Sequence, residues 1–113
     1  MTPQDRYQAL DIIHRCLLAS GHKLVTAESL TCGMIASQLA ATSGCSAYLR
    51  GGFVVYDIDM KVELLGVDRE LAASCNCVSP AVAMQMALGA KKRTGAECAI
   101  STTGYAEAWH EKD

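Results

Sequence analysis

The chain has 113 residues, half of them apolar, and a net charge of −2. This length and composition predict a single domain over residues 1–113 and exclude a disordered, collagen-like or low-complexity chain. The densest basic run, Lys91-Lys92-Arg93, lies at the predicted end of a helix, where cations favour the helix dipole. Direct nucleic-acid binding is therefore not expected.

Residues 1–11 are polar and mixed in charge, unlike a signal peptide, and no apolar stretch reaches the roughly 18 residues that span a bilayer. We therefore expect a cytoplasmic protein that does not contact the membrane. A reducing compartment keeps the six cysteines as thiols. Cys75 and Cys77 are separated by one residue, whereas common zinc sites have two to four. We predict no metal site and expect most of the cysteines to be small buried apolar residues.

Apolar spacing, helix caps and glycine stops divide the chain into alternating helices and strands. In chain order we predict a helix from Thr2-Pro3 to Gly21, a strand over 23–27, a helix from about Thr31 to Ser43-Gly44, a strand over 52–56, a helix over 60–65 capped by Asp57 or Asp59, a helical turn over 68–73, a helix from Ser79-Pro80 to Gly95, and a strand over 97–102. The alternation predicts an α/β fold, a three-layer αβα arrangement around a largely parallel sheet.

Small polar residues follow the predicted strands. The first strand is followed by Glu28-Ser29-Leu30-Thr31-Cys32-Gly33, and the second contains Tyr56 and is followed by Lys61. Thr103 and Gly104 follow the third. In open α/β sheets, ligands bind at the carboxyl ends of the strands. These residues are therefore the candidate site.

Hydrolysis of an amide needs a nucleophile, a base and donors for the oxyanion. None of the three histidines lies in the strand-end motifs, so a Ser-His-Asp set is not expected. A lysine acts as a base once burial or neighbouring cations lower its pKa. Lys61 is the lysine within the motif region and is our candidate base.

The order and spacing of these residues, from about Leu24 to Gly104, resemble the C-terminal domain of the CinA competence/damage-inducible protein family. The resemblance implies that family's fold, with its last strands and final helix lacking in residues 1–113. It also implies the activity of the family's stand-alone members, which deamidate nicotinamide mononucleotide to nicotinate mononucleotide and ammonia, with no cofactor.

The resemblance pairs Lys61 with Ser46 as nucleophile and gives the Tyr56 hydroxyl the task of orienting the lysine or the amide. Ser29 is the alternative nucleophile, and the Cys32 thiol at a helix N-terminus is a more remote one. Cys32 also stands where the family usually has glycine. The segment Ala106-Glu107-Ala108-Trp109 lacks the glycine-rich loop of active members.

The remaining site residues are expected to bind substrate. Ser29, Thr31 and Gly33 would hold a nucleotide phosphate at a helix N-terminus. Glu28 could position a ribose hydroxyl or the lysine, or simply favour the helix start. Thr103 matches a hydroxyl position of the family's site, next to Gly104. The predicted partners are a small-molecule nucleotide and further copies of the chain, as a homodimer or larger homo-oligomer. The alternative function is a non-catalytic CinA-like module for nucleotide binding or competence.

Overall fold

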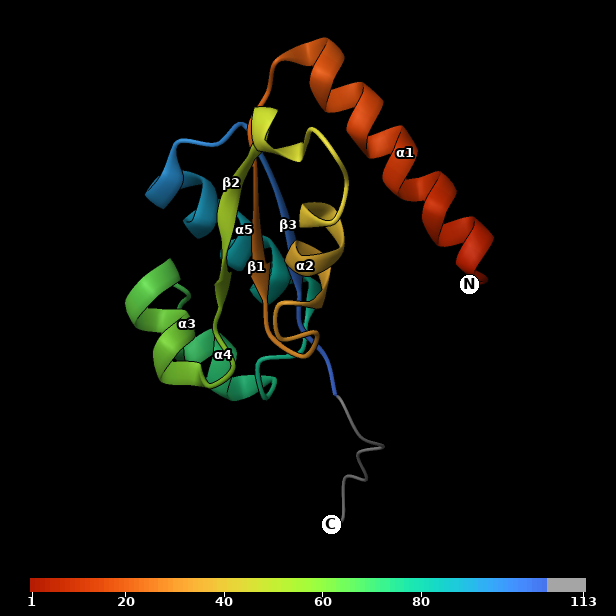
Figure 1. Ribbon diagram of the computed structural model, residues 1–113. Helices are drawn as coiled ribbons and strands as arrows, with labels where there is room; N and C mark the ends of the chain where they lie inside the picture. Colours follow the sequence, from red (N-terminus) through yellow and green to blue (C-terminus); the bar gives the residue numbers. More distant parts are fainter. Residues whose placement is uncertain (106–113) are drawn as a thin grey trace.

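The computed structural model describes residues 1–105 (Figure 1). Its elements are, in chain order, α1 (Pro3–Ser20), β1 (Leu24–Glu28), α2 (Met34–Ala40), the 3-10 helix η1 (Cys45–Ala47), β2 (Leu49–Val54), α3 (Ile58–Leu65), α4 (Arg69–Ser74), α5 (Pro80–Thr94) and β3 (Cys98–Thr102). Every predicted helix and strand is present. The spacing of apolar residues, together with the helix caps and glycine stops, therefore located these elements correctly.

The two longest helices begin and end as their caps predict. Thr2 and Asp5 form a capping box at the start of α1, and Gly21 ends that helix in the left-handed conformation with φ of 72°. Ser79 caps α5 by accepting a hydrogen bond from the Val82 N–H. These local hydrogen bonds satisfy end groups that the helix itself leaves unpaired.

Several boundaries differ from the prediction, and those of the second strand and the second helix matter most for the site. The strand predicted over 52–56 begins earlier, at Leu49, and ends at Val54, because pairing with β1 continues through the glycines Gly51 and Gly52. Helix α2 begins at Met34 rather than Thr31. Residues 29–33 form a loop instead, which ends at Gly33 with φ of 98°.

The sheet has three parallel strands in the order β2-β1-β3, which confirms the predicted α/β class. Central strand β1 is buried on both faces. Val25 and Ala27 pack in the core formed with α3, α4 and α5, whereas Leu24 packs with Leu17 of α1 and Leu39 of α2. Helices on both faces make three layers, and α1 extends away from the rest of the molecule (Figure 1).

Parallel strands bring three chain segments together at one edge of the sheet. Glu28 at the end of β1 is in register with Val54 of β2 and Thr102 of β3. The segments that follow the strands, residues 29–33, 55–57 and 103–105, therefore meet there. This edge is where polar groups from distant parts of the sequence converge.

The cysteines are free thiols and none of the six is fully buried, but Cys45, Cys75, Cys77 and Cys98 pack against the core clusters, so the prediction that most are small core residues holds only in part. Cys16 and Cys32 are exposed and the others are half-buried. Within residues 1–105, no helix is long and apolar enough to cross a bilayer. In the same part of the chain, no cluster of three or more His, Cys, Asp or Glu side chains could hold a metal ion.

Candidate active site

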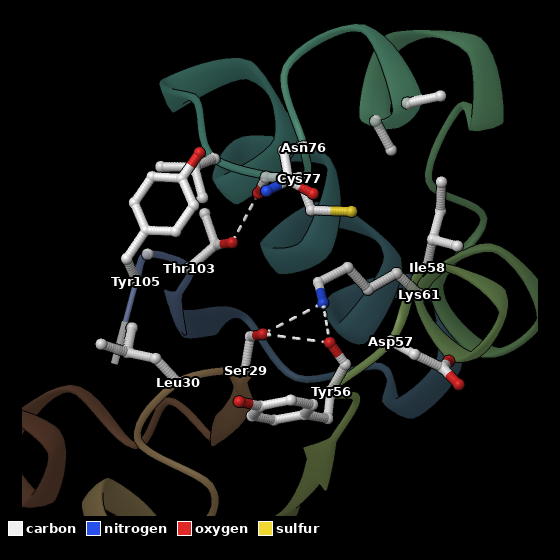
Figure 2. A pocket seen from close by; sticks show the side chains of 14 residues that line it. Ser29, Leu30, Tyr56, Asp57, Ile58, Lys61, Asn76, Cys77, Thr103 and Tyr105 are labelled. Atoms are coloured by element: carbon white, nitrogen blue, oxygen red, sulfur yellow. Dashed lines mark hydrogen bonds between the residues drawn. The ribbon is translucent and has the colours of Figure 1, made fainter. Parts of the chain in front are cut away.

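A pocket of about 300 Å³ lies at the carboxyl edge of the sheet (Figure 2). Its walls come from the segments after the three strands, from α3 and from the turn between α4 and α5. The polar and aromatic lining residues are Ser29, Tyr56, Asp57, Lys61, Asn76, Cys77, Thr103 and Tyr105. The predicted location of the site at the strand ends therefore coincides with a real cavity.

Lys61 extends from α3 into this pocket and contacts Ser29 (Figure 2). Its Nζ donates a hydrogen bond to Ser29 Oγ over 3.0 Å and another to the Tyr56 backbone oxygen over 2.6 Å. Only 1% of the lysine is exposed. A buried amine that contacts a serine hydroxyl is suited to accept that hydroxyl's proton.

Burial holds the pKa of Lys61 below its ordinary value of 10.5, because the charged amine loses its hydration. Electrostatic interactions with Cys77 and Asp57 oppose this shift. No carboxylate accepts a hydrogen bond from the lysine in the described part of the chain. The lysine is thus poised to be a neutral base closer to physiological pH than an exposed lysine would be.

The Glu28 carboxylate caps the N-terminus of α2. Its carboxylate is fully buried and accepts hydrogen bonds from the Ile35 and Ala36 N–H groups, each over 2.9 Å, and from the Thr31 hydroxyl. Burial raises the pKa of Glu28, but the hydrogen bonds from Thr31, Ala36, Ile35 and Gly33 together hold it below the ordinary value. The negative charge therefore lies at the positive end of the helix dipole, where an anionic ligand was predicted to bind.

A hydroxyl network fixes the Ser29 loop to β3. Thr31 Oγ1 lies 2.8 Å from Thr102 Oγ1, and the Ser29 N–H donates to the Thr102 backbone oxygen over 3.1 Å. The loop is therefore held by Glu28 on one side and by β3 on the other. Thr31 and Thr102 orient Ser29 without lining the pocket themselves.

The turn at Asn76 and Cys77 forms the wall opposite Ser29 (Figure 2). Both residues are left-handed, with φ of 52° and 64°, which is uncommon without glycine. The Thr103 hydroxyl donates to the Cys77 backbone oxygen and holds the turn in place. Sequence reasoning missed this wall. The asparagine before the Ser79-Pro80 helix start, a residue type enriched in left-handed turns, was the available signal.

Comparison with known proteins agrees with this fold. The family model described as the CinA C-terminal domain matches residues 7–113. The chain belongs to the CinA C-terminal domain family. CinA-like proteins of Mycolicibacterium gilvum and Chlorobium limicola are 48% and 43% identical to it, over 79% and 85% of this chain. Those alignments cover only 21% and 22% of the relatives, so the chain spans about a fifth of their length.

Solved structures of CinA-type proteins have the same fold. The competence/damage-inducible protein CihA of Agrobacterium tumefaciens superposes with a TM-score of 0.89 at 36% identity, over 97% of this chain and 67% of that one. The competence damage-inducible protein A of Klebsiella pneumoniae superposes with a TM-score of 0.88 at 32% identity, over 95% and 67%. The resemblance inferred from the strand-end motifs is thereby confirmed at the level of family and fold.

The predicted pairing of Ser46 with Lys61 needs correction in this CinA domain. Ser46 lies in η1, exposed, before β2 begins, whereas Tyr56 and Lys61 follow the end of β2. The strand has six residues and spans roughly 20 Å at about 3.3 Å per residue. Ser46 is therefore at the opposite edge of the sheet, and the serine in contact with Lys61 is the alternative, Ser29.

The other predicted site residues divide into two groups. Tyr56, Thr103 and Gly104 line the pocket, but Lys61 contacts the backbone oxygen of Tyr56 and not its hydroxyl. Gly33 does not line it, and the exposed Cys32 does not either, which removes the thiol as a nucleophile for this pocket. Cys32 has a φ of 51°, the conformation that glycine adopts without strain.

The amide groups predicted to hold a phosphate are not open to a ligand. The carboxylate of Glu28 occupies the start of α2, so neither a ribose hydroxyl nor the lysine is the partner of Glu28. Glu28 instead stabilises the start of α2, which was the third role considered for it. The segment Ala106-Glu107-Ala108-Trp109 lies outside the described residues.

Proposed function

We propose that this domain hydrolyses the carboxamide of a nicotinamide nucleotide, converting nicotinamide mononucleotide and water to nicotinate mononucleotide and ammonia. Ser29 is the nucleophile and Lys61 is the base. The observation that supports the proposal most directly is the 3.0 Å contact between Lys61 Nζ and Ser29 Oγ at the floor of the pocket. Membership of the CinA family is consistent with it, because the stand-alone members that the sequence resembles are such deamidases.

The chemistry follows from these two groups. Neutral Lys61 takes the proton of Ser29 Oγ as that oxygen attacks the amide carbon. The resulting ammonium then gives its proton to the departing nitrogen, which leaves as ammonia and an ester of Ser29. Water attacks the ester as Lys61 accepts its proton, and the lysine then gives that proton to the departing Ser29 Oγ as the carboxylic acid is released. Every proton passes through the lysine, so no histidine is needed.

The oxyanion requires donors beside Ser29. The N–H of Leu30, the residue after the nucleophile, has no hydrogen-bond partner among the described residues, and Leu30 lines the pocket. The N–H after a nucleophile on a tight turn commonly supplies one oxyanion donor. The Thr103 hydroxyl instead holds the Cys77 carbonyl, so its part is to shape the wall.

The test is ammonia release from nicotinamide mononucleotide by the purified chain and three variants. Ser29→Ala and Lys61→Met should each lower kcat by roughly 1,000-fold or more, because the two groups act as a unit. Ser46→Ala is the matched control at the opposite edge and should leave kcat unchanged. Activity lost in Ser46→Ala and kept in Ser29→Ala would refute the assignment.

A folded wild-type chain that releases no ammonia would favour the alternative, a non-catalytic CinA-like module. Circular dichroism of each variant establishes that it is folded. Nucleotide binding measured by calorimetry would then test whether the module still holds its ligand.

A further inference from the structure

The turn that follows α4 is fixed in the wall of the pocket, and it carries Asn76. The N–H of Cys77 donates to the Ala72 backbone oxygen over 2.7 Å, which ties the turn to α4. The Thr103 hydroxyl donates to the Cys77 backbone oxygen, which ties the same turn to the segment after β3. The side chain of Asn76 therefore has a defined place relative to the strand ends.

Asn76 has the left-handed conformation, with φ of 52°. Asparagine tolerates this conformation better than most residues and commonly follows a helix end, so the angle alone implies no function. The place of the side chain adds the functional argument, because it is exposed and lines the cavity. Within residues 1–105, its amide makes no hydrogen bond. A residue in a costly conformation that presents a polar group to a pocket is typical of a ligand contact.

The position of Ser29 determines which part of a nicotinamide nucleotide faces Asn76. For attack, the carboxamide carbon must lie beside Ser29 Oγ, where Lys61 accepts the proton. The carboxamide and the ribose are attached to different atoms of the pyridine ring, so the ring separates them. With the carboxamide at Ser29, the ribose extends away from the serine. Figure 2 shows Asn76 on the wall of the cavity opposite Ser29, the wall that the ribose then approaches.

We propose that Asn76 is a specificity-determining residue that binds the ribose hydroxyls of the substrate. The oxygen of its amide accepts a hydrogen bond and the nitrogen donates two, whereas each ribose hydroxyl can do either. One asparagine can therefore bind two neighbouring hydroxyls, one as donor and one as acceptor. Asn76 takes no part in proton transfer. The inference rests on the proposed function and assigns the recognition of one part of that substrate.

The experiment compares two substrates in the wild-type chain and in Asn76→Gly, with ammonia release as the readout. The substrates are nicotinamide mononucleotide and its 2′,3′-dideoxy analogue, which lacks both ribose hydroxyls. Glycine adopts the left-handed conformation without strain, so this variant removes the amide and keeps the turn. Asn76→Gly should lower kcat/KM for the nucleotide about 10- to 30-fold, mainly through KM, as the loss of two neutral hydrogen bonds implies. For the analogue, kcat/KM should change less than about 3-fold, because the partner hydroxyls are already missing.

Cys32→Gly is the matched control. Cys32 is also left-handed, with φ of 51°, and exposed, but it does not line the pocket. Its replacement should leave the ratio of the two kcat/KM values at that of the wild type. Circular dichroism establishes that both variants are folded.

The outcomes separate the two proposals. An unchanged kcat/KM for the nucleotide in Asn76→Gly, or an equal fall for both substrates, overturns the role of Asn76 and leaves the deamidase intact. A folded wild-type chain that releases no ammonia overturns the proposed function. Calorimetry then decides on Asn76 by the ratio of the two Kd values: a ratio that Asn76→Gly does not change overturns the inference, and a ratio that falls about 10-fold supports it.

Discussion

At Gly89, helix α5 passes close to the backbone of α3, and Gly89→Ala tests whether this contact positions Lys61, the proposed base. A Cβ built on Gly89 would lie 1.9 Å from the Leu65 backbone oxygen and 2.8 Å from its carbonyl carbon. A tolerable carbon–oxygen contact is roughly 3.3 Å. The helices would therefore have to separate by about 1.4 Å, the difference between these two distances. The contacting atoms belong to the backbone, so no side-chain rotation can relieve the contact.

The displacement has a cost in stability and in activity. Overpacking of this kind destabilises by about 3 kcal/mol, and the higher helix propensity of alanine offsets about 1 kcal/mol, which leaves a net loss of about 2 kcal/mol. For a domain of this size that loss lowers Tm by about 10 °C. Lys61 lies one turn before Leu65 on α3, so its amine moves relative to Ser29. A shift of about 1 Å between reacting groups can lower kcat roughly 100-fold.

Thermal unfolding followed by circular dichroism measures the first effect, and ammonia release at a temperature where the variant is folded measures the second. Leu88→Ala, at the neighbouring and more exposed position of α5, is the control and should change kcat little. If Gly89→Ala raises Tm, as helix propensity alone would predict, the close approach of the two helices does not exist.

Three further changes test the electrostatics of the site. The pKa of Lys61 is lowered in the folded chain, so between that pKa and the ordinary 10.5 the unfolded chain binds more protons than the folded one. The free energy of unfolding of the wild type, measured by chemical denaturation, should therefore rise with pH across this window. Lys61→Met should not show this rise. Glu28→Gln should cost about 1–3 kcal/mol at pH 7 by replacing a buried acceptor with a donor. That difference should persist above pH 4.5 and vanish as pH falls through the lowered pKa of Glu28; a difference independent of pH would contradict the charged cap. Cys77→Ala removes an interaction that raises the pKa of Lys61, so the acid limb of the kcat/KM profile should move to lower pH, and an unmoved limb would show that Cys77 has no influence on the base.

Local signals in the sequence were enough to find the helices and strands. Thr2-Pro3 and Ser79-Pro80 determine helix starts, and Gly21 and Gly95 determine helix ends, because the hydrogen bonds involved join residues only a few positions apart. The boundary at residues 29–33 was less predictable. Helical spacing continued through Thr31, but the buried carboxylate of Glu28 reaches forward to Ile35 and Ala36 and stabilises a later start.

The sequence predicted where the candidate pocket lies, but it did not predict which serine contacts Lys61. The sequence alone determined the α/β class, the family and the edge of the sheet at which polar groups gather, since these depend on spacing along the chain. Only the tertiary structure decided which serine meets Lys61. Ser29 and Ser46 both lie within the same motif region, but parallel strands run in one direction, so a residue before β2 and a residue after β1 end at opposite edges. The burial of Lys61, which lowers its pKa, likewise arises from α3 packing over the strand ends, a contact that no local pattern specifies.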